Sequence, residues 1–184
     1  KDREILMKSS WDNARSRLPW LFASWVGGVC AAAIIGIFDN TLQSTLALAA
    51  FIPVVIGMGG NIGTQTSTLV VRGLATGRVN VGNNINIIFK EIRVGLILGI
   101  LYGLLLGLFA IMSFVDISPY LGLVVGLGIA CSMLIATAFG SLVPLLLHRM
   151  DIDPAIATGP FVTTSIDILG VTLYFVIANI FLPV

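Results

Sequence analysis

Hydrophobic residues fill long, nearly uninterrupted stretches of this chain, and short polar segments separate them. As helices rising about 1.5 Å per residue, five stretches can cross the roughly 30 Å hydrocarbon core of a bilayer. We place them at residues 18–38, 42–72, 92–114, 121–147 and 155–182. The pattern predicts an all-α polytopic membrane protein with five transmembrane helices.

The second and fifth stretches are longer than a straight crossing requires, and they contain Pro53 and Pro160. Proline removes a backbone hydrogen bond and clashes with the preceding helical turn. In the second stretch, the segment GMGGNIGTQT at 57–66 also places four glycines beside polar side chains. We therefore expect both helices to be kinked or broken, with backbone carbonyl groups near the glycines facing a cavity.

The basic residues all fall on one side of this topology. They are Lys1, Arg3, Lys8, Arg15 and Arg17 before the first span, Arg72, Arg78, Lys90 and Arg93 around the connection between the second and third, and Arg149 between the fourth and fifth. The opposite connections carry Asp39 and Asp116. We expect a multi-pass protein of the inner cell membrane. Because lysine and arginine favour the cytoplasmic side of short loops, its N-terminus would be cytoplasmic and its C-terminus outside.

The composition fits a bilayer, since 57% of the residues are hydrophobic and 10% are charged. We expect lipid as the surroundings and no nucleic-acid partner. Residues 1–17 alternate charged and apolar side chains, which predicts a cytoplasmic amphipathic connecting helix before a membrane domain at 18–184. A solvated tail is the alternative. The chain begins at Lys1 without a signal peptide, and we expect it to be a domain excised from a longer protein.

Glycine recurs at every fourth position of the third span, at Gly95, Gly99, Gly103 and Gly107. A shorter series begins in the fourth span with Gly122 and Gly126. Such ladders let helix backbones approach closely. We predict that they serve helix contact within the bundle and have no direct chemical role.

Asp167 is the one acidic or basic residue placed well inside an apolar span. A charged residue at the centre of a membrane helix costs about 2.5 to 3.5 kcal/mol on insertion scales, so such a group normally has a partner, a cavity or an ion. No lysine or arginine at membrane depth is available. Asp167 is therefore protonated, hydrogen-bonded by neighbouring hydroxyl groups, or bound to a cation. The other acids can all reach water: Asp2, Glu4, Asp12, Asp39, Glu91, Asp116, Asp151 and Asp153.

Helical spacing gives the second and fifth spans one polar stripe each. The stripes are Asn61, Gln65, Thr68 and Arg72 in the second span, and Thr163, Asp167, Gly170 and Tyr174 in the fifth. Polar faces at membrane depth are best satisfied across a water-filled cavity. The stripes therefore predict a cation path that contains Asn61 and Asp167.

These segments resemble a known family. The sequence PVVIGMGGNIGTQTSTLVVRGLATG at 53–77 is similar to the second-span signature of MgtE magnesium channels. The sequence DPAIATGPFVTTSID at 153–167 is similar to the stretch that leads to the pore aspartate of that family, which corresponds to Asp167. The resemblance extends over nearly all of the chain.

The resemblance implies a homodimer of five-helix subunits that conducts Mg²⁺ in largely hydrated form, with other divalent cations as further candidates. The pore would lie on the two-fold axis, lined by the second and fifth spans. By resemblance, Asp167 is the main metal ligand. The secondary contributors would be Asn61, the backbone around Gly59 and Gly60, and the backbone at Thr163.

Two departures from the family matter. Members commonly carry a cytoplasmic helical domain and paired cystathionine-synthase-type domains that sense magnesium, and this sequence includes neither. We expect such regulatory domains in the full-length protein; a naturally short relative is the alternative. Members also often have asparagine where this chain has Ile166. That difference leaves the choice among Mg²⁺, Mn²⁺, Co²⁺ and Ca²⁺ open.

Other functions compete with a channel. A proton-coupled carrier would use Asp167 as its protonation site. An intramembrane enzyme would need a second acid beside Asp167, or a base beside a serine, and His148 lies at the membrane edge. Pairing of two Asp167 groups in a dimer keeps that alternative open, although we expect no enzymatic activity. A purely structural subunit is the third alternative, and it would tolerate Asp167→Asn.

Overall fold

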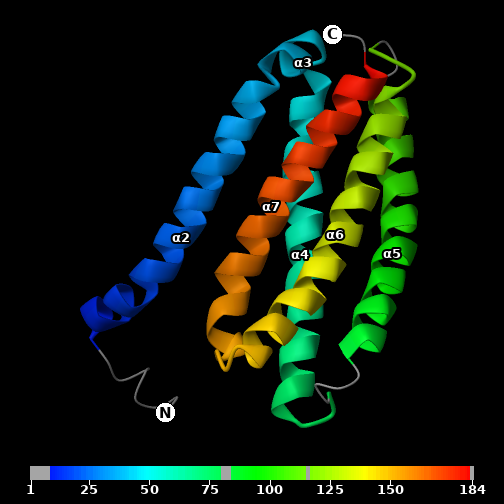
Figure 1. Ribbon diagram of the computed structural model, residues 1–184. Helices are drawn as coiled ribbons and strands as arrows, with labels where there is room; N and C mark the ends of the chain where they lie inside the picture. The colour runs from blue at the N-terminus through cyan, green and yellow to red at the C-terminus, as the bar shows by residue number, and fades with distance from the viewer. Residues whose placement is uncertain (1–8, 80–83, 115–116, 183–184) are drawn as a thin grey trace.

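A computed structural model describes residues 9–79, 84–114 and 117–182 of the chain (Figure 1). Within these ranges every regular element is an α-helix, as the hydrophobic pattern predicts. The elements are α2 (Ser10–Ile37), α3 (Asp39–Ser44), α4 (Ala47–Ala75), α5 (Asn84–Ser113), α6 (Leu121–Arg149) and α7 (Pro154–Phe181).

Helices occupy all five predicted positions. By length and composition, four of them can cross a membrane, namely α4, α5, α6 and residues Gly159–Phe181 of α7. The helix α2 adds a fifth span if its two parts, Ser10–Pro19 and Leu21–Ile37, are taken together across a 45° bend. Residues 1–8 of the predicted connecting helix, and Asp116, lie outside the described residues, whereas residues 10–17 belong to the first part of α2.

The predicted break in the second span is not observed. The helix α4 runs without interruption through Pro53 and through 57–66, and α7 likewise continues through Pro160. Side chains from neighbouring helices bond to carbonyls of α4 on either side of Pro53 and so tie this part of α4 to the bundle. Ser132 Oγ donates to the Val55 carbonyl at 3.2 Å, and the Tyr174 hydroxyl donates to the Leu48 carbonyl at 3.1 Å.

The helix α6 is the centre of the bundle and packs against α4, α5 and α7, while α2 packs along α7 (Figure 1). Gly27 of α2 makes this contact close, because a β-carbon there would overlap the Thr164 side chain. The start of α2 and the connections that follow α4 and α6 lie at one end of the bundle. The described basic side chains lie in these segments or in the adjoining parts of α4, α5 and α6. We call this end the basic end and the other, which contains α3, the opposite end.

Two apolar clusters form the core. The first lies toward the opposite end and includes Leu48, Phe51, Leu121, Val125 and Phe175. The second lies toward the basic end and includes Ile62, Ile129, Met133, Val162 and Ile166. Residues from α4, α6 and α7 contribute to both clusters, so these three helices form a closely packed unit.

Glycines bring α5 and α6 into backbone contact, which confirms the prediction that the ladders serve helix packing. A β-carbon on Gly103 would lie 2.7 Å from the Gly126 carbonyl oxygen, and one on Gly107 would lie 2.7 Å from the Gly122 carbonyl oxygen. Real β-carbons do not approach backbone this closely. Only glycine permits this separation of the two helices, as at other small-residue interfaces in membranes.

Candidate cation site

Asp167 is half-buried on α7 and lies beside Gly60, near the middle of α4. A β-carbon on Gly60 would stand 3.8 Å from the Oδ1 atom of the carboxylate. Among the described residues, the Asp167 carboxylate has no hydrogen-bond donor and no basic side chain as a partner. The structure therefore brings Asp167 and Gly60 together and leaves the carboxylate oxygens available to water or a cation.

Thr163 precedes Asp167 by one helical turn and is also half-buried. Its hydroxyl donates to backbone carbonyls of its own helix, at 3.0 Å to Gly159 and 3.2 Å to Pro160. With the proton committed in this way, the Thr163 oxygen can act only as an acceptor. Thr163 and Asp167 thus form a short face of acceptor oxygens on α7.

A polar groove of about 550 Å³ runs along α4 from the level of Gly60 toward the basic end. It is lined by Asn61, Thr64, Gln65, Thr68 and Leu69, all exposed in the single chain. The Thr64 hydroxyl donates to the Gly60 carbonyl at 2.7 Å, and the Thr68 hydroxyl donates to the Thr64 carbonyl at 2.8 Å. Their oxygens therefore present lone pairs to the groove and can accept hydrogen bonds from water.

Thr64 is a groove residue that the polar stripes did not include. It follows Asn61 by three residues, and this spacing on a helix was the signal that could have identified it. Its bond to the Gly60 carbonyl also affects the predicted ligands, because that oxygen already accepts hydrogen bonds inside a continuous helix. Gly60 therefore does not provide a carbonyl oxygen freed by a helix break.

Gly59 serves helix packing. It is buried, and a β-carbon there would overlap Ser132 Oγ and lie 3.1 Å from Cγ2 of Ile166. Ile166 is 1% exposed and also fills the space beside Gly63. The residue at which this chain departs from the resembled family is therefore a core residue, on a different face of α7 from its neighbour Asp167.

Gly170 and Tyr174 were predicted to share the polar stripe of Asp167, but both are buried against α6. A β-carbon on Gly170 would lie 2.9 Å from Ser132 Oγ, and one on Gly128 would lie 2.5 Å from Cδ2 of the Tyr174 ring. The polar face of α7 therefore ends at Asp167. Ser132, which no sequence pattern singled out, is the polar residue on which α4 and α7 both pack.

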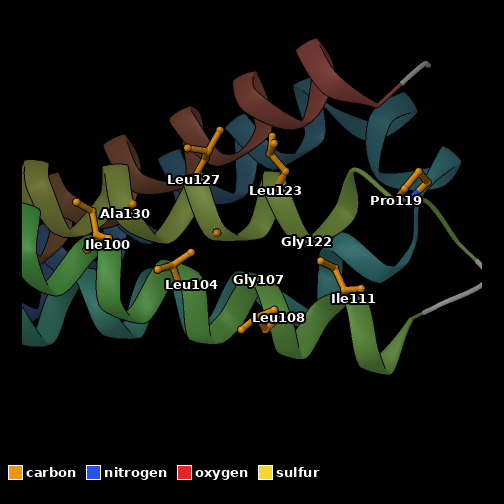
Figure 2. A pocket seen from close by; sticks show the side chains of 13 residues that line it. Ile100, Leu104, Gly107, Leu108, Ile111, Pro119, Gly122, Leu123, Leu127 and Ala130 are labelled. Carbon is orange, nitrogen blue, oxygen red and sulfur yellow. The ribbon is translucent and has the colours of Figure 1, made fainter.

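A second cavity lies between α5 and α6 and has a different character. It measures about 410 Å³, and Figure 2 shows Leu104 and Leu108 of α5 and Leu123 and Leu127 of α6 along it. The lining includes no charged residue and no polar side chain. This cavity suits hydrocarbon, so the acceptor oxygens near Asp167 form the better site for a cation.

Asp167 acts as a single carboxylate in the described part of the chain, where no three His, Cys, Asp or Glu side chains converge on one point. One carboxylate with nearby hydroxyl and amide oxygens cannot enclose a metal ion. It can hold a cation that keeps most of its water, which is the form in which Mg²⁺ usually binds to proteins.

Comparisons with known proteins agree with this chemistry. Residues 52–177 match the family model MgtE, described as a divalent cation transporter. Three proteins called magnesium transporter MgtE are similar to the chain. The protein from Bacillus subtilis is 37% identical over 92% of this chain, that from Enterococcus faecalis 34% over 98%, and that from Thermus thermophilus 34% over 91%. The matched regions span 37%, 40% and 36% of these relatives, respectively, so the chain covers well under half of their length.

Proposed function

This chain belongs to the MgtE family of divalent cation transporters, and from that premise we propose that it conducts hydrated Mg²⁺ through a membrane pore in which Asp167 binds the ion. The observation that carries the proposal is the Asp167 carboxylate. It lies within a membrane helix, has no partner among the described residues, and stands beside Gly60, the residue before Asn61 of the α4 polar groove. An ionisable group in such a position normally belongs to an ion or proton pathway.

The direction in which the polar groove faces supports a homodimer. Asn61, Thr64, Gln65 and Thr68 are exposed on the single chain, although α4 is apolar and long enough to lie in lipid. Polar side chains at membrane depth require protein or water as neighbours. A second copy related by a two-fold axis would close the groove into a water-filled path. The same symmetry would supply a second Asp167 to the ion.

Two carboxylates and several acceptor oxygens suit Mg²⁺ better than a complete protein cage. Mg²⁺ gives up water reluctantly and demands octahedral geometry. In the proposed complex Asp167 neutralises charge, while Asn61 and the Thr163 hydroxyl contact the water shell. Such contacts bind weakly enough for the ion to leave, as conduction requires. We place the basic end in the cytoplasm, in keeping with the distribution of lysine and arginine.

A flux assay in liposomes tests the proposal. The purified chain and its Asp167→Asn variant are compared with Mg²⁺, Mn²⁺ and Ca²⁺ in parallel. We expect the substitution to lower Mg²⁺ flux by about tenfold or more, because the ion loses its charged ligand. Asp39→Asn is the control, since Asp39 is an exposed acid at the opposite end that bonds to Gln43. Wild-type flux in Asp167→Asn would refute the assigned role.

The same assay separates a channel from a proton-coupled carrier, for which an unpartnered carboxylate would be the protonation site. We expect Mg²⁺ flux to persist without a proton gradient and to grow with the Mg²⁺ gradient. Flux that stops when the proton gradient is removed would favour the carrier.

A further inference from the structure

A hydrogen bond joins α4 to α5 near the basic end. The Thr66 hydroxyl donates to the Oε2 atom of Glu91 at 3.1 Å. Thr66 is 2% exposed, and Glu91 is half-buried, although its position near the start of α5 suggested contact with water. This acid is therefore directed into the helix bundle.

The bond spans a gap between the two helices. The main packing partner of α5 is α6, and its backbone scarcely approaches α4 in the described residues. Thr66 is also held from the α6 side, because a β-carbon on Gly140 would lie 3.1 Å from the Thr66 β-carbon and 2.5 Å from the Gly63 carbonyl oxygen. Thr66 thus lies where α4, α5 and α6 meet, and the Glu91 side chain connects α5 to this point.

Thr66 faces away from the polar groove. Residues two apart on a helix point about 200° apart, so Thr64 and Thr68 lie on the other side of α4 from Thr66. The groove side is exposed and the Thr66 side is buried. A shift or rotation of this half of α4 would therefore move Thr66 and the groove residues together.

We propose that Glu91 is a positioning residue for the cation path. By accepting the Thr66 hydroxyl, it sets the rotation and position of the half of α4 that carries Thr64, Gln65 and Thr68. Glu91 itself touches no ion in this role. The inference rests on the proposed function only in that α4 lines the path.

Without its acceptor, the Thr66 hydroxyl would be left buried and unpaired, or would turn back to a carbonyl of its own helix. Either outcome releases α4 from α5. A glutamine at 91 keeps an acceptor oxygen at the same reach and removes the charge. The hydrogen bond and the charge can therefore be tested separately.

Mg²⁺ flux in liposomes is the first test, with Glu91→Ala, Glu91→Gln, Thr66→Val and the double variant Thr66→Val/Glu91→Ala. We expect Glu91→Ala and Thr66→Val each to lower flux by about fivefold to tenfold. We expect the flux of the double variant to equal about that of the less active single variant, since both changes remove the same hydrogen bond. Glu91→Gln should stay within about twofold of the wild type. Independent, multiplying effects in the double variant, or a Gln variant as inactive as Ala, would overturn the proposal.

Thr137→Val is the matched control. Thr137 is a fully buried threonine on α6 whose hydroxyl bonds to the Leu134 carbonyl of its own helix at 3.0 Å. We expect its flux to remain near the wild-type value. A loss equal to that of Thr66→Val would show that any buried threonine in the bundle has the same effect, and would contradict a specific role for the Thr66–Glu91 bond.

A second measurement does not depend on transport. The Gln65→Cys substitution is introduced in a background with Cys30→Ala and Cys131→Ala. The new thiol is then labelled with a water-soluble thiol reagent. We expect Glu91→Ala and Thr66→Val to change the labelling rate by about threefold or more, and Glu91→Gln to leave it unchanged. Unaltered labelling in both disruptive variants would overturn the positioning role. Altered labelling together with normal flux in Asp167→Asn would instead uphold the positioning of α4 and refute the ion-binding role of Asp167.

Discussion

The Oδ1 atom of Asp167 lies 3.8 Å from the point where a β-carbon on Gly60 would stand. That distance is an ordinary van der Waals contact, so Gly60→Ala fits without moving a neighbour. The added methyl group would nevertheless occupy space that water or a hydrated ion needs beside the carboxylate. We expect Gly60→Ala to lower Mg²⁺ flux by roughly threefold to tenfold in liposomes, because the methyl group would obstruct the approach of the hydrated ion to the Asp167 carboxylate. Unchanged flux would mean that ions do not pass on this side of Asp167.

Gly59→Ala should destabilise the fold and Gly60→Ala should not, although the two residues are adjacent. A β-carbon there would overlap Ser132 Oγ and press on Ile166, and such overpacking typically costs about 1 to 3 kcal/mol. Replacing glycine by alanine in a helix gains about 1 kcal/mol, which offsets the cost only in part. We therefore expect Gly59→Ala to lower the thermal unfolding midpoint in detergent and Gly60→Ala to keep or raise it. Equal midpoints for the two variants would contradict the packing assignment.

The Thr64 oxygen should contribute to the path as an acceptor. Its proton is bonded to the Gly60 carbonyl, so valine at 64 would replace a lone pair in the groove with a methyl group. We expect Thr64→Val to reduce Mg²⁺ flux by about threefold to tenfold, because the hydrated ion loses a hydrogen-bond acceptor. Thr64→Ser keeps the hydroxyl and should transport nearly as well as the wild type. A serine variant as inactive as the valine variant would point to shape as the cause.

The glycines between α5 and α6 should be less replaceable than those that face open space. Alanine at Gly103 would place a β-carbon 2.7 Å from the Gly126 carbonyl oxygen, and backbone cannot turn aside as a side chain can. We expect Gly103→Ala to destabilise the protein by about 1 to 3 kcal/mol in detergent unfolding measurements. Gly57→Ala is the control, because a β-carbon there would meet nothing within 4 Å. Similar losses for both would indicate a general effect of helical glycines.

The sequence allowed the helices and the key carboxylate to be predicted, because both depend on local composition. An apolar stretch of sufficient length has few structures open to it in lipid, and Asp167 was conspicuous as a charge inside such a stretch. The groove on α4 contains Asn61, Gln65 and Thr68 of the first stripe, whereas only Thr163 and Asp167 of the second stripe lie on the polar face of α7. The assignment of Asp167 to ion binding stays a prediction.

The errors came from features that depend on neighbouring helices. Pro53 and the nearby glycines suggested a break, yet Ser132 and Tyr174 provide hydrogen bonds to α4, and Gly59 and Gly63 make room for Ile166. Likewise Tyr174 shares a face with Asp167 by spacing but packs against Gly128 of α6. The Thr66–Glu91 bond joins α4 to α5, and the residue pattern within each helix does not define how the two helices align.

The proposed dimer can be tested by cross-linking, because a two-fold axis beside the α4 groove would bring identical groove residues toward each other. In a background with Cys30→Ala and Cys131→Ala, we expect a cysteine at Leu69 to form covalent dimers with a short bifunctional thiol reagent in membranes. Leu69 is 60% exposed and lines the groove. A cysteine at Leu104, 63% exposed beside the apolar cavity of α5 and α6, is the control and should remain monomeric. Dimers through residue 104 alone would place the contact on the α5 face, leave the polar side chains of α4 facing lipid, and so contradict the pore proposed between two copies.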